Sequence, residues 1–423
     1  MKKRNFALFM NLITICLAVC AIAIGVYSIK TASLNIGGSL GFVAHNAKVN
    51  IKAYMYGFSN TESGENPVKE TNKVQLTVDG GLNIDGNIGE INIQSTKGTG
   101  STKRYFSDAS GDLEPITIVL TITNNSDFEV LLEDLTLDTS NYFIICDTPI
   151  KVLYTSSTPT KQTTTLTYEI RPAFNDDGTY KELTNASVAI SMSFTKTSVN
   201  IASTGFTLDE TTKAVTGLPT LEQNGGSDIL IIPTVFSDKP GITFTTLSSS
   251  GTGVYVPNAN LYSKIVILDG YTTLDSSCFC SATNIKYVYI PNSVENIGDD
   301  AFLNSGIITL NIPNNVDFYY WLQTCPNLVG IAEGMTELNG VAFLNCSSLQ
   351  YVKLPKSLTK IYDRAFEGCT SLKRVEFGDT SKTWTVSRGD GTNTEISVAN
   401  PIQNAKYLTS IFVTEAYYLT KNA

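Results

Sequence analysis

Five segments in the C-terminal half of the chain repeat one spacing of apolar residues, in outline Leu-x-x-Val-x-Leu followed by Pro or Gly. They begin at Ile285, Ile307, Leu328, Leu349 and Leu372, so successive segments start 21 to 23 residues apart. A unit of this length cannot bury its own apolar face and must stack on its neighbours. The period therefore predicts an elongated stack for nearly half of the chain, and it favours binding over catalysis.

Each repeat also carries filler residues for the layers of such a stack. Ala301-Phe302 recurs as Ala365-Phe366, which supplies one small and one large side chain per layer and lets adjacent layers interdigitate. The middle repeat departs from this pattern, with Trp321-Leu322 in place of Ala-Phe and Glu333 in an apolar position. We therefore expect a distortion between residues 321 and 334.

Three of the eight cysteines occupy one position of successive repeats. Cys325, Cys346 and Cys369 each lie three residues before the leucine that begins the next segment. Equivalent positions stack on the core side, where a free Cys behaves as a small hydrophobe. A buried ladder of thiols is favoured, and disulfide bridging is the alternative. With one histidine and no Cys-x-x-Cys, the sequence predicts no metal site and no cofactor.

The N-terminus combines a basic cluster with a long apolar run. Lys2, Lys3 and Arg4 precede the uncharged stretch from Phe6 to Ile29. As a helix this stretch rises roughly 35 Å, enough to cross a hydrocarbon core of about 30 Å. The basic cluster predicts a cytoplasmic N-terminus and an exported remainder. Residues 1–30 are therefore expected to be a membrane anchor or a signal peptide, which makes the protein anchored at the cell surface or secreted.

Residues 33–197 show short alternating strands in place of the repeat. Ile116–Thr123 and Val188–Phe194 alternate with period two, and Asn175-Asp-Asp-Gly178 is a strong turn signal. This pattern predicts an antiparallel β-sandwich. The whole chain is predicted to be mostly β, with the helix at 1–30, the sandwich at 33–197, a hinge at 198–204 and a capped repeat domain at 205–423.

Charge and the scarcity of catalytic residue types exclude several classes of function. Charged residues make up 16% of the chain and the net charge is −9, whereas nucleic-acid binding needs clustered Lys and Arg. His45 is the only histidine, and no Gly-x-Ser-x-Gly turn accompanies it. We therefore expect neither nucleic-acid binding nor enzymatic activity.

Two of the repeats resemble a known family. Ile290-Pro-Asn-Ser-Val-Glu-Asn-Ile-Gly-Asp-Asp-Ala-Phe302 and the segment from Leu354 to Leu372 are similar to the BspA-type leucine-rich repeat family. The resemblance covers about residues 225 to 378, with looser likeness to the end of the chain. It implies a curved solenoid on a bacterial or protist surface protein associated with adhesion, and it transfers no catalytic residue.

The repeat strands also define a candidate binding surface. Residues between the apolar positions of Leu-x-x-Val-x-Leu point away from the core. Tyr and Arg among them are residue types enriched at binding hot spots. The alternative is an ordinary solvated sheet face, because β-propensity by itself favours Tyr and Thr. The candidate binding residues on this exposed strand face are Tyr287, Tyr289, Thr309, Asn311, Tyr351, Lys353, Arg374 and Glu376.

The predicted function is non-catalytic adhesion, in which the repeat face binds a protein or glycan on a host or neighbouring cell. The alternative is a structural matrix or envelope component that assembles through the sandwich. Arg388-Gly389-Asp390 resembles an adhesion tripeptide, but Asp-Gly between alternating strands is itself a hairpin signal, and the hairpin is favoured.

Overall fold

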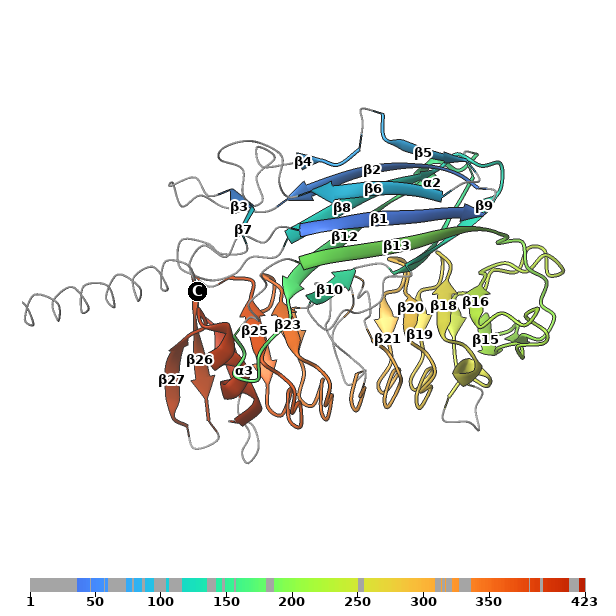
Figure 1. Ribbon diagram of the computed structural model, residues 1–423. Coiled ribbons are helices and arrows are strands. Elements are labelled where there is room, and N and C mark those ends of the chain that lie inside the picture. The colour runs from blue at the N-terminus through green and yellow to red at the C-terminus, as the bar shows by residue number, and fades with distance from the viewer. Residues whose placement is uncertain are drawn as a thin grey trace, which may run out of the picture.

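The protein consists of two units that lie one against the other in the computed structural model, a two-sheet unit above and a repeat unit below (Figure 1). The predicted helix from Phe6 to Ile29 lies outside the described residues. No helix in the described part of the chain is both long and apolar enough to span a membrane. The structure describes residues 36–45, 47–56, 58–59, 74–77, 80–85, 88–94, 104–105, 116–134, 142–146, 149–155, 157–179, 186–249, 255–308, 313, 316, 322–326, 336–379, 381–388, 391–410 and 418–422.

The two-sheet unit is built from strands whose apolar residues alternate, as the sequence predicts. On β8, Ile118, Leu120 and Ile122 are fully buried and alternate with the half-buried Thr117, Val119, Thr121 and Thr123, so one face of the strand enters the core shared by both sheets. The first sheet has the order β11-β9-β13-β1-β6, with bounds β11 Ile150–Leu153, β9 Glu129–Asp134, β13 Ala186–Thr197, β1 Ile36–His45 and β6 Ile88–Gln94. The second has the order β10-β12-β8-β2-β4 with β5 beside β2, and its bounds are β10 Tyr142–Cys146, β12 Thr163–Pro172, β8 Ile116–Asn124, β2 Lys48–Tyr56, β4 Val74–Gln75 and β5 Leu82–Asp85. Outside these sheets lie β3 (Phe58–Ser59), which pairs with β7 (Arg104–Tyr105), and the short helix α2 (Pro159–Gln162).

One pairing differs from the antiparallel prediction. β1 runs parallel to β13 along its whole length, from Ile36 opposite Ala186 to His45 opposite Thr195. A hairpin can join only antiparallel strands, whereas these two are far apart in the sequence and are free to pair in either direction. The first and last strands of the unit therefore lie side by side, and local alternation carried no information about their direction.

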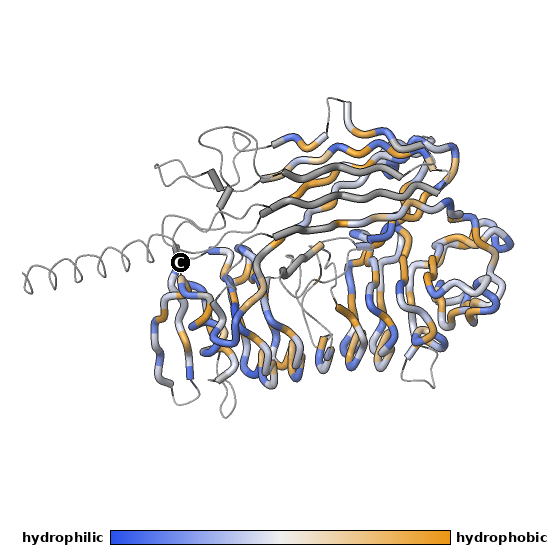
Figure 2. The backbone as a smooth tube through the Cα atoms, viewed as in Figure 1, coloured by the Kyte–Doolittle hydropathy of each residue, from blue (hydrophilic) through white to orange (hydrophobic). Residues whose placement is uncertain are grey.

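The repeat unit stacks its strands in parallel and in register, in two rows (Figure 1). Leu247, Leu274 and Ile297 follow one another across neighbouring strands of the second row, and all three are buried. Figure 2 shows hydrophobic stretches recurring in successive turns of the unit. The first row consists of β16 (Ile229–Ile232), β18 (Lys264–Ile267), β20 (Tyr287–Tyr289), β23 (Tyr351–Leu354) and β25 (Arg374–Phe377). The second consists of β15 (Ala214–Gly217), β17 (Thr246–Leu247), β19 (Thr273–Leu274), β21 (Asn296–Ile297), β22 (Glu337–Leu338) and β24 (Lys360–Tyr362), and the 3-10 helix η2 (Ala259–Leu261) lies between the rows in sequence.

The predicted fillers form stacked layers. The rings of Phe279 and Phe302 stack with centroids 5.2 Å apart, and Phe343 stacks on Phe366 at 5.3 Å. The residue just before each Ala-Phe pair has a left-handed backbone conformation, and in one repeat this residue is Val341, with φ 58°. A β-branched residue is strained at positive φ. Most of the segment expected to be distorted, including Trp321, lies outside the described residues.

The cysteine ladder is confirmed for the described residues, where every cysteine is a buried free thiol. Each repeat thiol donates a hydrogen bond to a carbonyl oxygen of the preceding turn. The distances are 3.1 Å from Cys325 to Phe302, 2.9 Å from Cys346 to Leu322 and 3.0 Å from Cys369 to Phe343. The thiols therefore tie adjacent layers together without covalent bonds.

Both ends of the stack are capped. At the N-terminal end, β14 (Thr207–Asp209) forms an antiparallel hairpin with β15. At the C-terminal end, β28 (Tyr418–Lys421) inserts between β24 and β26 (Thr383–Ser387), and β27 (Asn393–Ser397) and α3 (Pro401–Ser410) complete the cap. The amide nitrogen of Arg388 donates to the carbonyl of Thr392 at 2.9 Å, which closes the β26–β27 turn and confirms the predicted hairpin. Gly389 and Asp390 lie outside the described residues.

Candidate functional site

The side chains between the apolar positions of the first strand row point away from the repeat core, as predicted. The two-sheet unit, however, covers this outward face. Only 1% of Tyr351 and 4% of Arg374 is exposed, and the expectation that this face is free in solvent is wrong for both. The other described members of the set are half-buried: Tyr287, Tyr289, Lys353 and Glu376. The remaining two, Thr309 and Asn311, lie outside the described residues.

Near the N-terminal end of the row, the contact between the units is apolar. Leu131, Ile150 and Val152 of the two-sheet unit form one buried cluster with Ile231 and Val266 of the repeat unit. Burying side chains of this size contributes roughly 1.5 to 3 kcal/mol each. This end of the contact therefore has the character of a protein core.

A sequence signal for this contact existed. On β16 and β18 the inward residues are Leu230 and Ile265, so Ile231 and Val266 occupy outward positions. Apolar residues at outward positions of neighbouring strands indicate that something must cover them. The prediction considered the outward Tyr, Arg and Lys of later repeats and missed this pair.

Ion pairs flank the apolar contact, most with the cation on the repeat unit; the pair of Lys161 in the two-sheet unit with Asp269 in the repeat unit is the exception. Lys264 of the repeat unit pairs with Glu133, and the Lys353 Nζ lies 3.0 Å from the Glu169 Oε1. In both pairs the cation belongs to the repeat unit and the carboxylate to the two-sheet unit. Such partly exposed pairs contribute little to stability, about 0 to 1 kcal/mol each, but they fix which surfaces face each other.

The segment predicted as a hinge is attached to the repeat unit. Ser203 donates from its hydroxyl to Asp238 at 2.6 Å, and the amide of Ser237 donates to the carbonyl of Ile201 at 2.9 Å. Val199 and Ile201 pack against the apolar contact. The connection between the units is therefore part of their contact.

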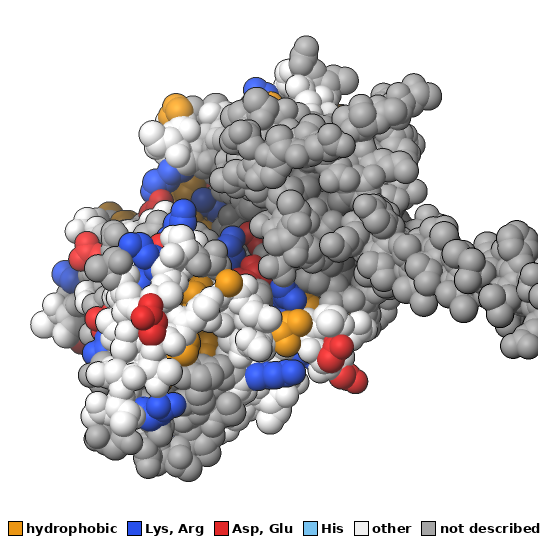
Figure 3. Space-filling view, turned by 90° about the vertical axis from the view of Figure 1, so that its left-hand side faces the viewer, with side chains coloured by type: hydrophobic (Ala, Val, Ile, Leu, Met, Phe, Trp, Pro, Cys, Tyr) orange, Lys and Arg blue, Asp and Glu red, His pale blue; other side chains and the backbone are white. Residues whose placement is uncertain are grey.

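A loop of the two-sheet unit, residues 173–179, reaches the C-terminal end of the row, and we call it the docking loop. Its Phe174 ring lies 6.2 Å from the Tyr351 ring, and the guanidinium carbon of Arg374 lies 5.9 Å from the centroid of Phe174. Arg374 Nη1 also donates to the carbonyl of Gly178 at 3.4 Å. Figure 3 views this end of the molecule and shows Lys and Arg side chains close to the recess between the two units.

The backbone of Gly178 lies so close to the repeat unit that no side chain fits at this position. Its φ is +86°, and a Cβ there would lie 2.9 Å from the carbonyl oxygen of Lys373 and 3.2 Å from Ile402 Cγ2. Only glycine combines this conformation with this proximity. The sequence predicted a turn at Asn175–Gly178, but not that the turn docks on a repeat.

The docking loop holds its own shape. The amide of Asn175 donates to the carbonyl of Thr179 at 2.7 Å, and the amide of Gly178 donates to that of Asn175 at 3.0 Å. Asp177 Oδ1 accepts from the hydroxyl of Thr179 at 2.6 Å and from its amide at 2.9 Å. These hydrogen bonds lower the pKa of Asp177. None of these four contacts involves the repeat unit.

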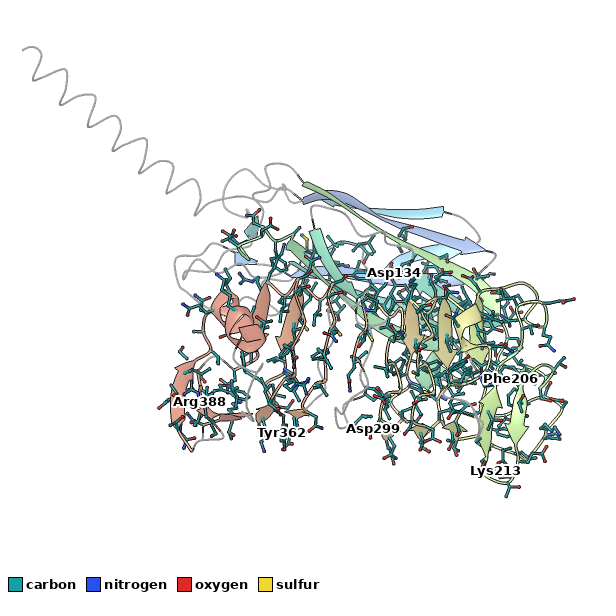
Figure 4. All side chains as sticks on the ribbon, turned by 90° about the horizontal axis from the view of Figure 1, so that it is seen from below. Asp134, Phe206, Lys213, Asp299, Tyr362 and Arg388 are labelled. Atoms are coloured by element: carbon teal, nitrogen blue, oxygen red, sulfur yellow. The ribbon has the colours of Figure 1, made fainter. Side chains whose placement is uncertain are left out.

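The second strand row, which we call the open row, is less covered over its described residues: Asn296 is exposed, and Thr246 and Thr273 are half-buried. Thr246, Thr273 and Asn296 lie next to buried residues and therefore point outward. Figure 4 shows Tyr362 along the edge of the repeat unit that lies opposite Asp134 of the two-sheet unit.

At the C-terminal end of the open row, three side chains interact across β22 and β24. The Lys360 ammonium lies 4.2 Å from the Tyr362 ring centroid, and the Tyr362 hydroxyl donates to Glu337 Oε2 at 3.2 Å. Within the described part of the chain, no group of three His, Cys, Asp or Glu side chains could hold a metal ion. The described residues of the open row therefore offer hydroxyl, amide and charged groups.

Comparison with known proteins assigns the repeats. Residues 242–328 and 317–387 match the family model described as "BspA type Leucine rich repeat region", in six copies. This stretch is a BspA-type leucine rich repeat region. The predicted resemblance is confirmed. No curated protein matches the chain.

Several solved structures are similar over part of the chain. A leucine rich cell surface protein from Faecalibacterium prausnitzii is 28% identical over 28% of this chain and 32% of its own, with a TM-score of 0.27. A leucine-rich repeat protein from Eubacterium ventriosum is 22% identical over 34% of this chain and 40% of its own, with a TM-score of 0.29. The T. pallidum Leucine Rich Repeat protein is 16% identical over 40% of this chain and 78% of its own, with a TM-score of 0.30. The chain thus spans about a third of the first and two fifths of the second.

Proposed function

We propose that this protein is a non-catalytic adhesion protein of a bacterial surface, in which a capped solenoid binds a protein or glycan of a host or neighbouring cell. The match to BspA-type leucine rich repeats supports a binding role. The apolar run at residues 6–29 supports export and attachment to the membrane.

The open second row is the surface proposed to meet the external ligand. The observation that carries this assignment is the covered first row, where Tyr351 is only 1% exposed. Asn296 on the open row is exposed and Thr273 is half-buried, and their amide and hydroxyl groups can bond either a peptide backbone or sugar hydroxyls.

Adherence of cells that carry the full chain tests the proposal. Replacing Thr273 and Asn296 by arginine adds bulk and charge to the open row and is expected to reduce adherence at least about tenfold, as loss of about 1.4 kcal/mol would. The matched control is Thr165→Arg, an exposed strand position of the two-sheet unit. Equal adherence of the two variants would reject the open row as the ligand surface.

A further inference from the structure

We propose that the C-terminal end of the covered row is a second binding site, for a protein turn that carries an aromatic residue followed by carboxylates. The chain's own docking loop occupies this site as a built-in ligand. The site lies on a different surface from the open row, so this proposal does not depend on where an external adhesion ligand binds.

The site combines one aromatic wall with three cations, one of which, Lys353, is already paired with Glu169 of the two-sheet unit. Tyr351 forms the wall, and its hydroxyl donates to Glu376 Oε2 at 2.8 Å, which holds the ring in place. Arg374 is 4% exposed, and its Nη2 lies 4.0 Å from the Glu376 Oε1. Lys353 and Lys373 flank these residues on β23 and just before β25. A buried guanidinium beside an aromatic ring and two ammonium groups favours a ligand that supplies both a ring and anionic oxygens.

The built-in ligand has that chemistry. Phe174 fills the space against the Tyr351 ring and below the Arg374 guanidinium. The Asp176 carboxylate lies 3.4 Å from the Lys373 ammonium, and the Gly178 carbonyl accepts from Arg374. The occupant therefore shows the spacing a partner turn needs, with the ring two residues before the carboxylate and four before the carbonyl.

The two ends of the contact between the units differ in composition, since Phe174 is the one large apolar side chain that the docking loop buries. The end near Ile231 and Val266 is a buried apolar cluster, which holds the units together. At the docking loop, the Asp176 pair is fully exposed on the acid side and contributes little because solvent screens it. Because the loop keeps its turn by internal hydrogen bonds, it can leave as a unit without refolding. A partner turn that competes must overcome the high effective concentration of the tethered loop.

The test is binding of a fluorescent peptide with the sequence of residues 171–179, Arg-Pro-Ala-Phe-Asn-Asp-Asp-Gly-Thr, to the full chain. The variants Gly178→Ala and Phe174→Ala should empty the site, by clash and by loss of the ring. The peptide is expected to bind each at least about tenfold more tightly than the unaltered chain, since a loop that fills the site nine-tenths of the time lowers apparent affinity by that factor. Adding Lys373→Glu to either variant should weaken binding, because it sets a carboxylate against Asp176, and a peptide with alanine in place of phenylalanine should not bind.

Three outcomes would overturn the proposal. The first is equal affinity for the unaltered chain and both emptied variants. The second is no binding to any of them, which would make the loop a structural joint only. The third is binding that Lys373→Glu leaves unchanged, which would place the peptide elsewhere. Adherence through the open row is measured separately, so its failure leaves this result unaffected.

Discussion

Replacing Gly178 by alanine separates the docking of the two units from the folding of either one. The added Cβ meets two costs. The first is the left-handed backbone, at φ +86°, which disfavours an L-residue by about 1 to 2 kcal/mol. The second is the contact at 2.9 Å with the backbone oxygen of Lys373, and overpacking of this kind typically costs about 1 to 3 kcal/mol. The sum is about 2 to 5 kcal/mol, and only the second part reports on docking.

Gly241→Ala is the matched control, because Gly241 has φ +80° and nothing within 4 Å of its would-be Cβ. The free energy of unfolding, from urea denaturation of the full chain, should fall about 1 to 3 kcal/mol further for Gly178→Ala than for Gly241→Ala. Hydrogen exchange should then quicken at residues 173–179 and around Lys373, with the two-sheet core at Ile118–Ile122 unaffected. Equal destabilisation by the two substitutions, with unchanged exchange at the docking loop, would refute the reasoning.

Three further results are expected. Val341→Asn should raise the free energy of unfolding by about 0.5 to 1 kcal/mol in urea denaturation, because asparagine tolerates the left-handed conformation at φ 58° better than valine does; an unchanged or lower value would argue against strain there. Burial raises the pKa of Cys369 to about 12, so alkylation by iodoacetamide, followed by mass spectrometry, should stay negligible at pH 8 to 10 in the folded chain and become rapid in urea; rapid labelling of the native chain would contradict the buried ladder. Hydrogen bonds from Ser381 and Lys421 lower the pKa of Asp379 to about 2 in the folded state. The contribution of the ionised Asp379 to the stability of the fold is therefore present above its unfolded-state pKa near 3.9, and it is lost as the pH falls towards 2. Exchange at β28 should quicken over that range in the unaltered chain but show no such pH step in Asp379→Asn.

Sequence patterns predicted well which side chains of each strand are buried, because a local period decides which side chains enter the core. Val288 and Leu354 are buried at the positions that the 21-to-23-residue repeat assigns to them. The thiol ladder followed from the same repeat, since equivalent positions of stacked turns share one environment. The prediction that all strands of the two-sheet unit are antiparallel was wrong for β1 beside β13, because the alternation along a strand is the same for parallel and antiparallel neighbours.

The candidate site was predicted correctly in position and wrongly in exposure. Tyr351 and Arg374 do point away from the repeat core, yet both are buried under the two-sheet unit. A period of two distinguishes the two sides of a strand, but it cannot tell whether the outward side meets water or another domain. Ile231 and Val266 were the residues that carried this information, because an apolar side chain on the outward side needs a cover.

The sequence by itself was enough to predict that residues 285–378 stack as repeats, because each repeat carries its own strand, turn and filler residues and needs only a like neighbour. Only the tertiary structure decided what the first strand row meets. Lys353 and Glu169 are 184 residues apart in the chain, and Arg374 and Gly178 are 196 apart. Contacts at such separations depend on the shapes of two finished surfaces, and no local period encodes how those surfaces fit.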